Sequence, residues 1–350
     1  MWLTCSSIGR KFVMALTGAC LVLFVTFHVL MNAVALLWPT AYNAVCEFLG
    51  ANWYALVASA GLALLFIIHI IYALWLTIQN RRARGNDRYA IAGAAPGVEW
   101  SSKNMLVLGI VVLAFLVVHM IQFWSKMQLQ ELISHNLSAY PSVNGLVADP
   151  AYGTLFLQMA FSSWWTPVIY IIGFIALWFH MNHGFWSMFQ TVGWDNNIWI
   201  SRLKKISCWW TSIVVLLFIA QAIVFTVRAH QEYYTTNEAL LAQYAEGLSA
   251  KAEEPVKAFV NEFNACRQQA MTGNPAAVDE FIKANGQAYY DQLAPIVAAA
   301  EALPAAKGDQ FVGTAIQIVE MLKQQYNISD KAAEPAPAEA AAPADNNTQN

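Results

Sequence analysis

The chain has 350 residues, of which 58% are hydrophobic and only 12% are charged, and its net charge is −3. A soluble globular domain carries about 25% charged residues. The composition therefore excludes an ordinary soluble protein, and we expect no nucleic-acid partner.

Five apolar blocks are each long enough to cross a bilayer as a helix, which takes about 20 residues. The first is too long for the apolar core of a signal peptide, so we interpret it as a retained span. We therefore expect an all-α polytopic membrane protein, with a bundle of five transmembrane helices in residues 1–230. The blocks are Phe12–Leu37, Ala55–Ile78, Met105–Phe123, Pro167–Phe189 and Ile206–Val227.

Basic residues gather at alternate ends of these spans, whereas the other connecting segments contain only Lys126. By the positive-inside rule, the N-terminus is expected in the cytoplasm and the C-terminus on the outer side of the membrane. The basic groups are Arg10-Lys11, then Arg81, Arg82, Arg84, Arg88 and Lys103, and finally Arg202, Lys204 and Lys205.

Outside the spans, two polar segments have helical patterns. Residues 127–137 predict an interfacial helix in the second outer loop. Residues 231–330 form a polar extension with apolar residues at helical spacing and without a catalytic motif. Breaks at Pro255, Gly273-Asn274-Pro275, Leu303-Pro304 and Gly308 predict three or four helices there. Residues 331–350, rich in Ala, Pro and Glu, are expected to be disordered.

Four histidines, one in each of the first four spans, are the most informative residues: His28, His69, His119 and His180. Ionisable residues inside a membrane usually mark a pathway or a cofactor. At about 1.5 Å per residue, His28 and His119 lie roughly 21–24 Å from the inner starts of their spans, and the other two lie roughly 20 Å from outer starts. The histidines thus form an outer pair and an inner pair, as two bis-imidazole haem b groups would require.

The sequence also allows other interpretations of the histidines. A lone histidine in an apolar helix is commonly a hydrogen-bonded packing residue. His183, one turn from His180, could compete as a ligand, whereas His135 and His230 are expected at the polar surface. No CxxCH motif occurs, so covalent c-type haem is not expected.

Four segments closely resemble the di-haem cytochrome b membrane anchor of succinate dehydrogenase/fumarate reductase, in its single-chain, five-helix, menaquinone-linked bacterial form. The resemblance covers about residues 1–230. Its segments are SSIGRKFVMALTGACLVLFVTFHVLMN, HIIYALWLTIQNRRARGNDRYA, LVVHMIQFW and FHMNHGFWSMFQTVGW. The extension beyond residue 230 departs from many members of the family.

The resemblance implies that His28 and His119 ligate an outer (distal) haem b, and His69 and His180 an inner (proximal) one. In the family pattern H-x-x-[NH]-G-x-W-S, His180 matches the ligand and His183 the later polar position. It also implies an iron–sulfur subunit and a flavoprotein subunit with FAD on the cytoplasmic face of the bacterial inner membrane. The chain would pass electrons between them and menaquinone, without itself acting on the dicarboxylate.

The quinone and propionate residues are expected by analogy with the family. Glu47 is the only acidic residue between the first two spans, and it is either the carboxylate that accepts the quinol proton or an interfacial surface residue. Arg10, Lys11 and Arg81 lie at the level where haem propionates need cations, although topology alone also explains them.

Two other classes of function also use apolar spans of this kind. A haem b anchor of a formate dehydrogenase or hydrogenase would place its histidines differently, and the fourth-span motif argues against it. A non-redox transporter is not supported by broken helices or by an internal repeat. A haem spectrum would separate the transporter from the other two.

Overall fold

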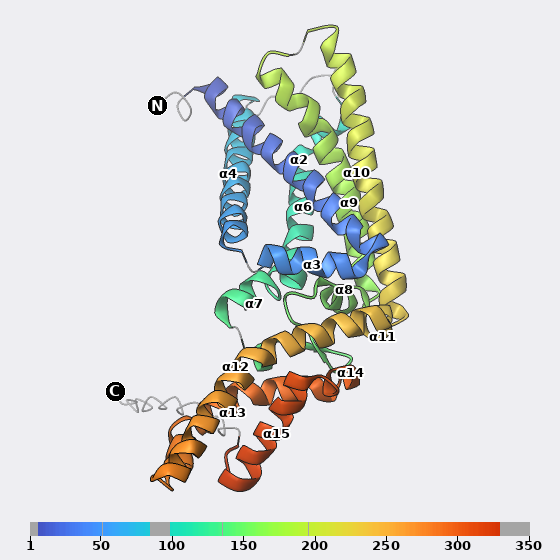
Figure 1. Cartoon of the computed structure of the whole chain (residues 1–350). Coiled ribbons are helices and arrows are strands. Elements are labelled where there is room, and N and C mark those ends of the chain that lie inside the picture. The colour runs from blue at the N-terminus through green and yellow to red at the C-terminus, as the bar shows by residue number, and fades with distance from the viewer. Residues whose placement is uncertain (1–5, 51, 85–98, 135, 195, 330–350) are drawn as a thin grey trace, which may run out of the picture. The chain divides into compact units, whose positions relative to one another are not determined.

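The structure is a computed structural model that describes residues 6–50, 52–84, 99–134, 136–194 and 196–329. It is almost entirely helical, and within those ranges five helices are long and apolar enough to span a membrane. The prediction of an all-α membrane protein is confirmed (Figure 1). The five are α2 (Ser7–Leu37), α4 (Trp53–Arg84), α6 (Met105–His119) with its continuation Met120–Trp124, α9 (Trp165–Thr191) and α10 (Trp199–His230).

Helix α2 is central to the bundle, since it packs against α4, α9 and α10. It begins at the N-cap Ser6, whose hydroxyl accepts a hydrogen bond from Gly9 N at 2.9 Å. At its other end, the guanidinium of Arg228 donates to the carbonyls of Ala35 (2.8 Å) and Leu36 (2.9 Å). These carbonyls belong to the last turn, which has no intrahelical partners of its own.

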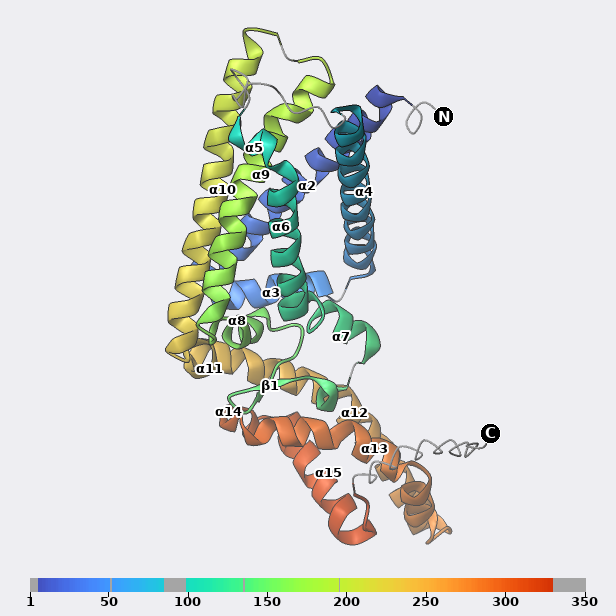
Figure 2. The same ribbon diagram turned by 180° about the vertical axis from the view of Figure 1, so that it is seen from behind.

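Helices α6, α9 and α10 form the other side of the bundle, and Figure 2 shows α6 beside α9. A Cβ atom on Gly173 of α9 would collide with the Phe115 ring of α6, so this glycine permits the close approach of the two helices. The surfaces that face outward remain apolar, as in Leu64 and Ile67 of α4. Exposed apolar side chains of this kind are suited to contact with lipid.

Short elements cover the end of the bundle at which α2 ends and α9 begins. One of them, α8, is buried over almost its whole length, and the sequence patterns did not predict it. The helix expected over 127–137 is present only as α7 and a 3₁₀ turn. The elements are α3 (Pro39–Gly50), α7 (Gln128–Ile133), the 3₁₀ turn Leu137–Ala139, the hairpin strands β1 (Ser142–Val143) and β2 (Leu146–Val147), and α8 (Gly153–Phe161). At the opposite end lies α5 (Trp100–Lys103).

The chain divides into two compact units, residues 1–246 and the part that follows Glu246. The first unit therefore extends past residue 230, the limit expected from the sequence, and includes α11 (Tyr233–Thr236) and the start of α12 (Glu238–Thr272). Buried hydrogen bonds account for this. Asn43 Oδ1 accepts from Thr154 N (3.0 Å) and Oγ1 (2.8 Å), and the hydroxyls of Thr154 and Tyr244 lie 2.8 Å apart. Gln243 is bonded to Asn43 as well (2.9 Å).

The second unit is helical, as expected, and contains the rest of α12, α13 (Ala277–Glu301), α14 (Pro304–Lys307) and α15 (Gln310–Tyr326). The helix break predicted at Pro255 is wrong, because α12 continues through it. Ala252, Val256 and Phe259 on either side are buried, and their packing stabilises the helix despite the missing N–H. The predicted disordered tail, 331–350, lies outside the described residues.

Candidate cofactor site: two transmembrane histidine pairs

The four span histidines form two close pairs. His28 of α2 and His119 of α6 have ring centroids 5.8 Å apart, with an interplanar angle of 85°. His69 of α4 and His180 of α9 have centroids 6.4 Å apart, with an angle of 65°. These are the two combinations that the depth of each residue in its span indicates.

The pairs are stacked along the bundle, and two helices give the same spacing. On α2, His69 contacts the helix at Thr17, 11 residues before His28. On α6, the ring of His180 lies against Gly109, 10 residues before His119. At about 1.5 Å per residue, the two counts separate the pairs by roughly 15–17 Å along the helix axes.

The tautomer of His119 follows from a chain of hydrogen bonds. Its Nδ1 lies 3.1 Å from the hydroxyl oxygen of Tyr170. That hydroxyl donates to Gln122 Oε1 (2.9 Å), while Gln122 Nε2 donates to Thr166 Oγ1 (3.2 Å). Because the single proton of the tyrosine hydroxyl is used on Gln122, the oxygen accepts from His119. His119 therefore carries its proton on Nδ1 and keeps the lone pair of Nε2.

Thr17 has the same relation to His69. The Thr17 hydroxyl donates to the carbonyls of its own helix, Val13 O at 2.9 Å and Met14 O at 3.1 Å. Its oxygen lies 3.2 Å from His69 Nδ1, and Thr17 is buried. The oxygen thus accepts from Nδ1–H, and Nε2 of His69 retains its lone pair.

The second imidazole of each pair has weaker polar contacts. Asn32 donates to the carbonyl of His28 (2.8 Å), while its amide nitrogen is 3.4 Å from the ring nitrogens. Phe24 stacks on the His28 ring at 5.4 Å. Buried Nδ1 of His180 has no hydrogen-bond partner among the described residues. A buried nitrogen without a hydrogen-bond partner costs free energy in an apolar interior. The His180 ring is therefore a candidate to bind a group that the chain itself does not supply.

The π-helical turn Met120–Trp124 begins directly after His119. Such turns within α-helices are frequent at functional sites. Here the turn contains Gln122, three residues after His119, and both side chains reach the Tyr170 hydroxyl. The irregularity thus coincides with the polar contacts of the His28–His119 pair.

Both pairs fit the coordination of a haem iron. Metal–nitrogen distances are about 2 Å, so imidazoles on opposite sides of one iron have centroids roughly 6 Å apart. The measured separations are close to this value. Among the described residues, no group of three or more His, Cys, Asp or Glu side chains could hold a metal ion together. The candidate ligands are therefore two histidines per site. At least one histidine of each pair is a neutral imidazole.

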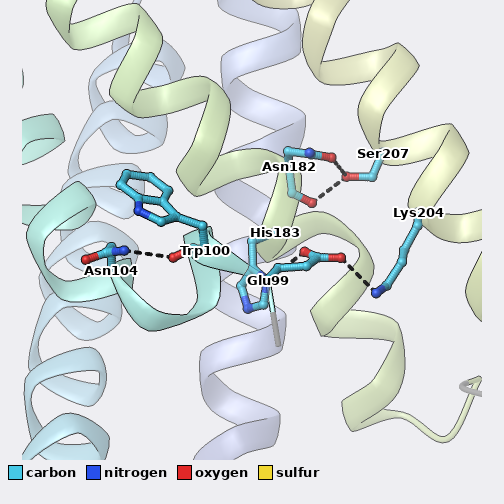
Figure 3. Close-up of polar contacts among 7 residues, drawn as sticks. All are labelled: Glu99, Trp100, Asn104, Asn182, His183, Lys204 and Ser207. Carbon is cyan, nitrogen blue, oxygen red and sulfur yellow. Dashed lines mark hydrogen bonds and ion pairs between the residues drawn. The ribbon is translucent and has the colours of Figure 1, made fainter. Parts of the chain in front are cut away.

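His183 is occupied by different contacts, at the end of the bundle where α9 ends and α10 begins (Figure 3). Its Nδ1 lies 3.6 Å from Glu99 Oε2, and Lys204 Nζ lies 2.7 Å from Glu99 Oε1. Burial raises the pKa of the Glu99 carboxyl, but Lys204 and His183 outweigh it and lower the pKa overall. Glu99 is therefore a carboxylate at neutral pH, and it is the charged partner of both His183 and Lys204.

The remaining candidate residues lie apart from the histidine rings. Glu47 is exposed on α3 rather than on the second span. Arg10, half-buried near the start of α2, lies over the ring of Trp75 at 5.4 Å. Lys11 and Arg81 are exposed at the same end of the bundle. His230 is exposed as well, while His135 and Arg88 lie outside the described residues.

The fold and these pairs define a class: a polytopic helical membrane protein with two half-buried histidine pairs within its spans. Comparison with known proteins does not identify it further, since no protein-family profile, no curated protein and no solved structure matches the chain.

Thr17, Tyr170 and Gln122 were not recognised from the sequence. The helical position of Gln122, three residues from a candidate ligand, is a signal for the same face. Thr17 and Tyr170, in contrast, contact histidines of other helices 51 or 52 residues away. Only the packing of the helices relates them to the site.

Proposed function

We propose that the chain is the membrane anchor and electron-transfer subunit of a succinate:quinone or quinol:fumarate oxidoreductase. The observation that carries the proposal is the joining of His28 with His119 and of His69 with His180 across four membrane-spanning helices. Together with the sequence resemblance in residues 1–230, it favours two bis-histidine haem b groups over isolated packing histidines.

The chain's own residues would provide position and tuning. Haem b supplies one-electron redox chemistry when it is bound. His28, His119, His69 and His180 would hold it, His119 and His69 through their Nε2 lone pairs. The apolar spans would exclude water, and the two pairs would give two haem positions about 15 Å apart along the bundle. Arg10, Lys11 and Arg81 are the proposed partners of the propionates, at the end nearer His69.

The partners proposed from the resemblance are an iron–sulfur subunit, a flavoprotein subunit with FAD, and menaquinone in the lipid. The basic ends of the spans support a cytoplasmic position of these hydrophilic subunits at the bacterial inner membrane, and an outer position of the residues after 230. Glu47, on the helix that follows α2, is the proposed acceptor of the quinol proton at this outer end.

Succinate-driven reduction of haem tests this function. In the complex purified from its native membrane, addition of succinate should reduce part of the haem b. Dithionite, added to the same preparation, should reduce all of it. The isolated chain should respond to dithionite alone, because it lacks the dicarboxylate site. A complex reduced by formate or hydrogen but not by succinate would favour the alternative dehydrogenase anchors, and a preparation without haem would favour the transporter.

The same preparation tests the quinone site. Glu47→Gln should slow reduction of the haems by a menaquinol analogue, since the amide cannot accept the proton. Its succinate-driven reduction and its haem content should remain normal. Unchanged reduction by the quinol would make Glu47 an interfacial surface residue.

A further inference from the structure

Each histidine pair contains one imidazole with a built-in hydrogen-bond acceptor, and the two acceptors differ. His119 donates to Tyr170, whose hydroxyl is itself bonded to Gln122. His69 donates to Thr17, whose hydroxyl is bonded to its own helix. Tyr170 and Thr17 are both almost fully buried, at 4% and 3% exposure. Neither contact follows from the resemblance to the anchor family.

Buried polar groups of this kind need an explanation, because each hydroxyl would cost free energy in an apolar bundle without a partner. Both hydroxyls direct their protons elsewhere and offer oxygen to a histidine Nδ1. They therefore select one tautomer and fix the rotation of the ring. In metal sites, such an outer partner of a ligating imidazole raises the basicity of the ligand.

We propose that Tyr170 and Thr17 are positioning residues that tune the two haems separately, Tyr170 through His119 and Thr17 through His69. The inference rests on the proposed function, since it needs haem at the pairs. Donation from Nδ1–H increases the electron density on the imidazole, which favours the ferric state over the ferrous state. Each acceptor thus lowers the midpoint potential of its own haem.

Redox titration of the haem spectrum in the purified complex tests the proposal. Tyr170→Phe should retain two haems and raise the midpoint potential of one of them. The phenyl ring keeps the contacts with Phe115 and Phe174, 5.0 and 5.8 Å away, so the change removes little besides the hydroxyl. Thr17→Val should raise the potential of the other haem, because its histidine belongs to the other pair.

A second substitution makes the test independent of the tyrosine. Gln122→Leu removes the group that holds the Tyr170 hydroxyl, and should raise the same midpoint as Tyr170→Phe, by a smaller amount. Combined with Tyr170→Phe it should add nothing further, because the chain of bonds is already interrupted. If the Tyr170→Phe complex does not assemble, the midpoint potential of the Gln122→Leu variant tests the proposal by itself.

The matched controls are Thr211→Val and Tyr290→Phe. Thr211 is a buried threonine of α10 whose hydroxyl has no hydrogen-bond partner among the described residues, and Tyr290 is a buried tyrosine of the second unit. Neither should shift a midpoint. Two haems with unchanged midpoints in Tyr170→Phe, Gln122→Leu and Thr17→Val would overturn the tuning proposal alone. Absence of haem from the unaltered complex would instead overturn the proposed function.

Discussion

Replacing His119 with alanine is expected to remove one of two haem b groups from the protein, and His28→Ala should remove the same one. Both residues lie in one pair, and a six-coordinate haem that loses an axial imidazole loses its specific anchorage. His69→Ala or His180→Ala should remove the other haem. Haem content and the low-temperature absorption spectrum of each purified variant measure the result.

His183→Ala is the matched control, since His183 is on the same helix one turn from His180. Its contact is with Glu99, and the variant should keep both haems. Were His183→Ala to lose a haem while His180→Ala kept two, the assignment of ligand in the fourth span would be reversed. Loss of different haems from His28→Ala and His119→Ala would show that the pairing is wrong.

The second large effect is expected from truncation of the C-terminal region. A chain that ends at Glu246 should keep both haems, whereas a chain that ends at His230 should unfold readily. The shorter chain lacks Tyr234, Leu240 and Tyr244, whose side chains are 0–4% exposed. Full burial of one such side chain contributes about 1.5–3 kcal/mol, so the loss is comparable with the roughly 5–15 kcal/mol that stabilises a typical protein.

The truncation also leaves buried polar groups without partners. Asn43 loses Gln243, and Thr154 loses the hydroxyl of Tyr244. Thermal unfolding of the two purified chains, with haem content as a second measurement, tests the expectation. Equal stability and equal haem content would mean that residues 231–246 are dispensable for both the fold and haem binding.

The membrane fold was predictable because its signal is local and strong. Five runs of apolar residues have the length of a bilayer, and their positions agree with the helices within a few residues at most ends. The positions of the histidines along these helices already indicated the pairs, since depth follows from residue count in a straight helix. Both inferences use only the geometry of one helix at a time.

Other features depend on packing and were missed for that reason. The segment of α8, GTLFLQMAF, is a short apolar run without a decisive period. Its burial requires α3 and α10, which lie far away in sequence. Pro255 in isolation predicts a helix break, whereas the buried residues around it keep α12 continuous. Nothing in the local sequence distinguishes Thr17 and Tyr170 from other residues of the spans. Their role follows only from contact with histidines of other helices.

The central claim is that the four paired histidines hold two haems, and the pyridine haemochrome assay on the purified chain measures this most directly. The expected result is two non-covalent haem b groups per polypeptide, both low-spin because each iron has two imidazole ligands. A ratio near zero or near one haem per polypeptide would contradict the account.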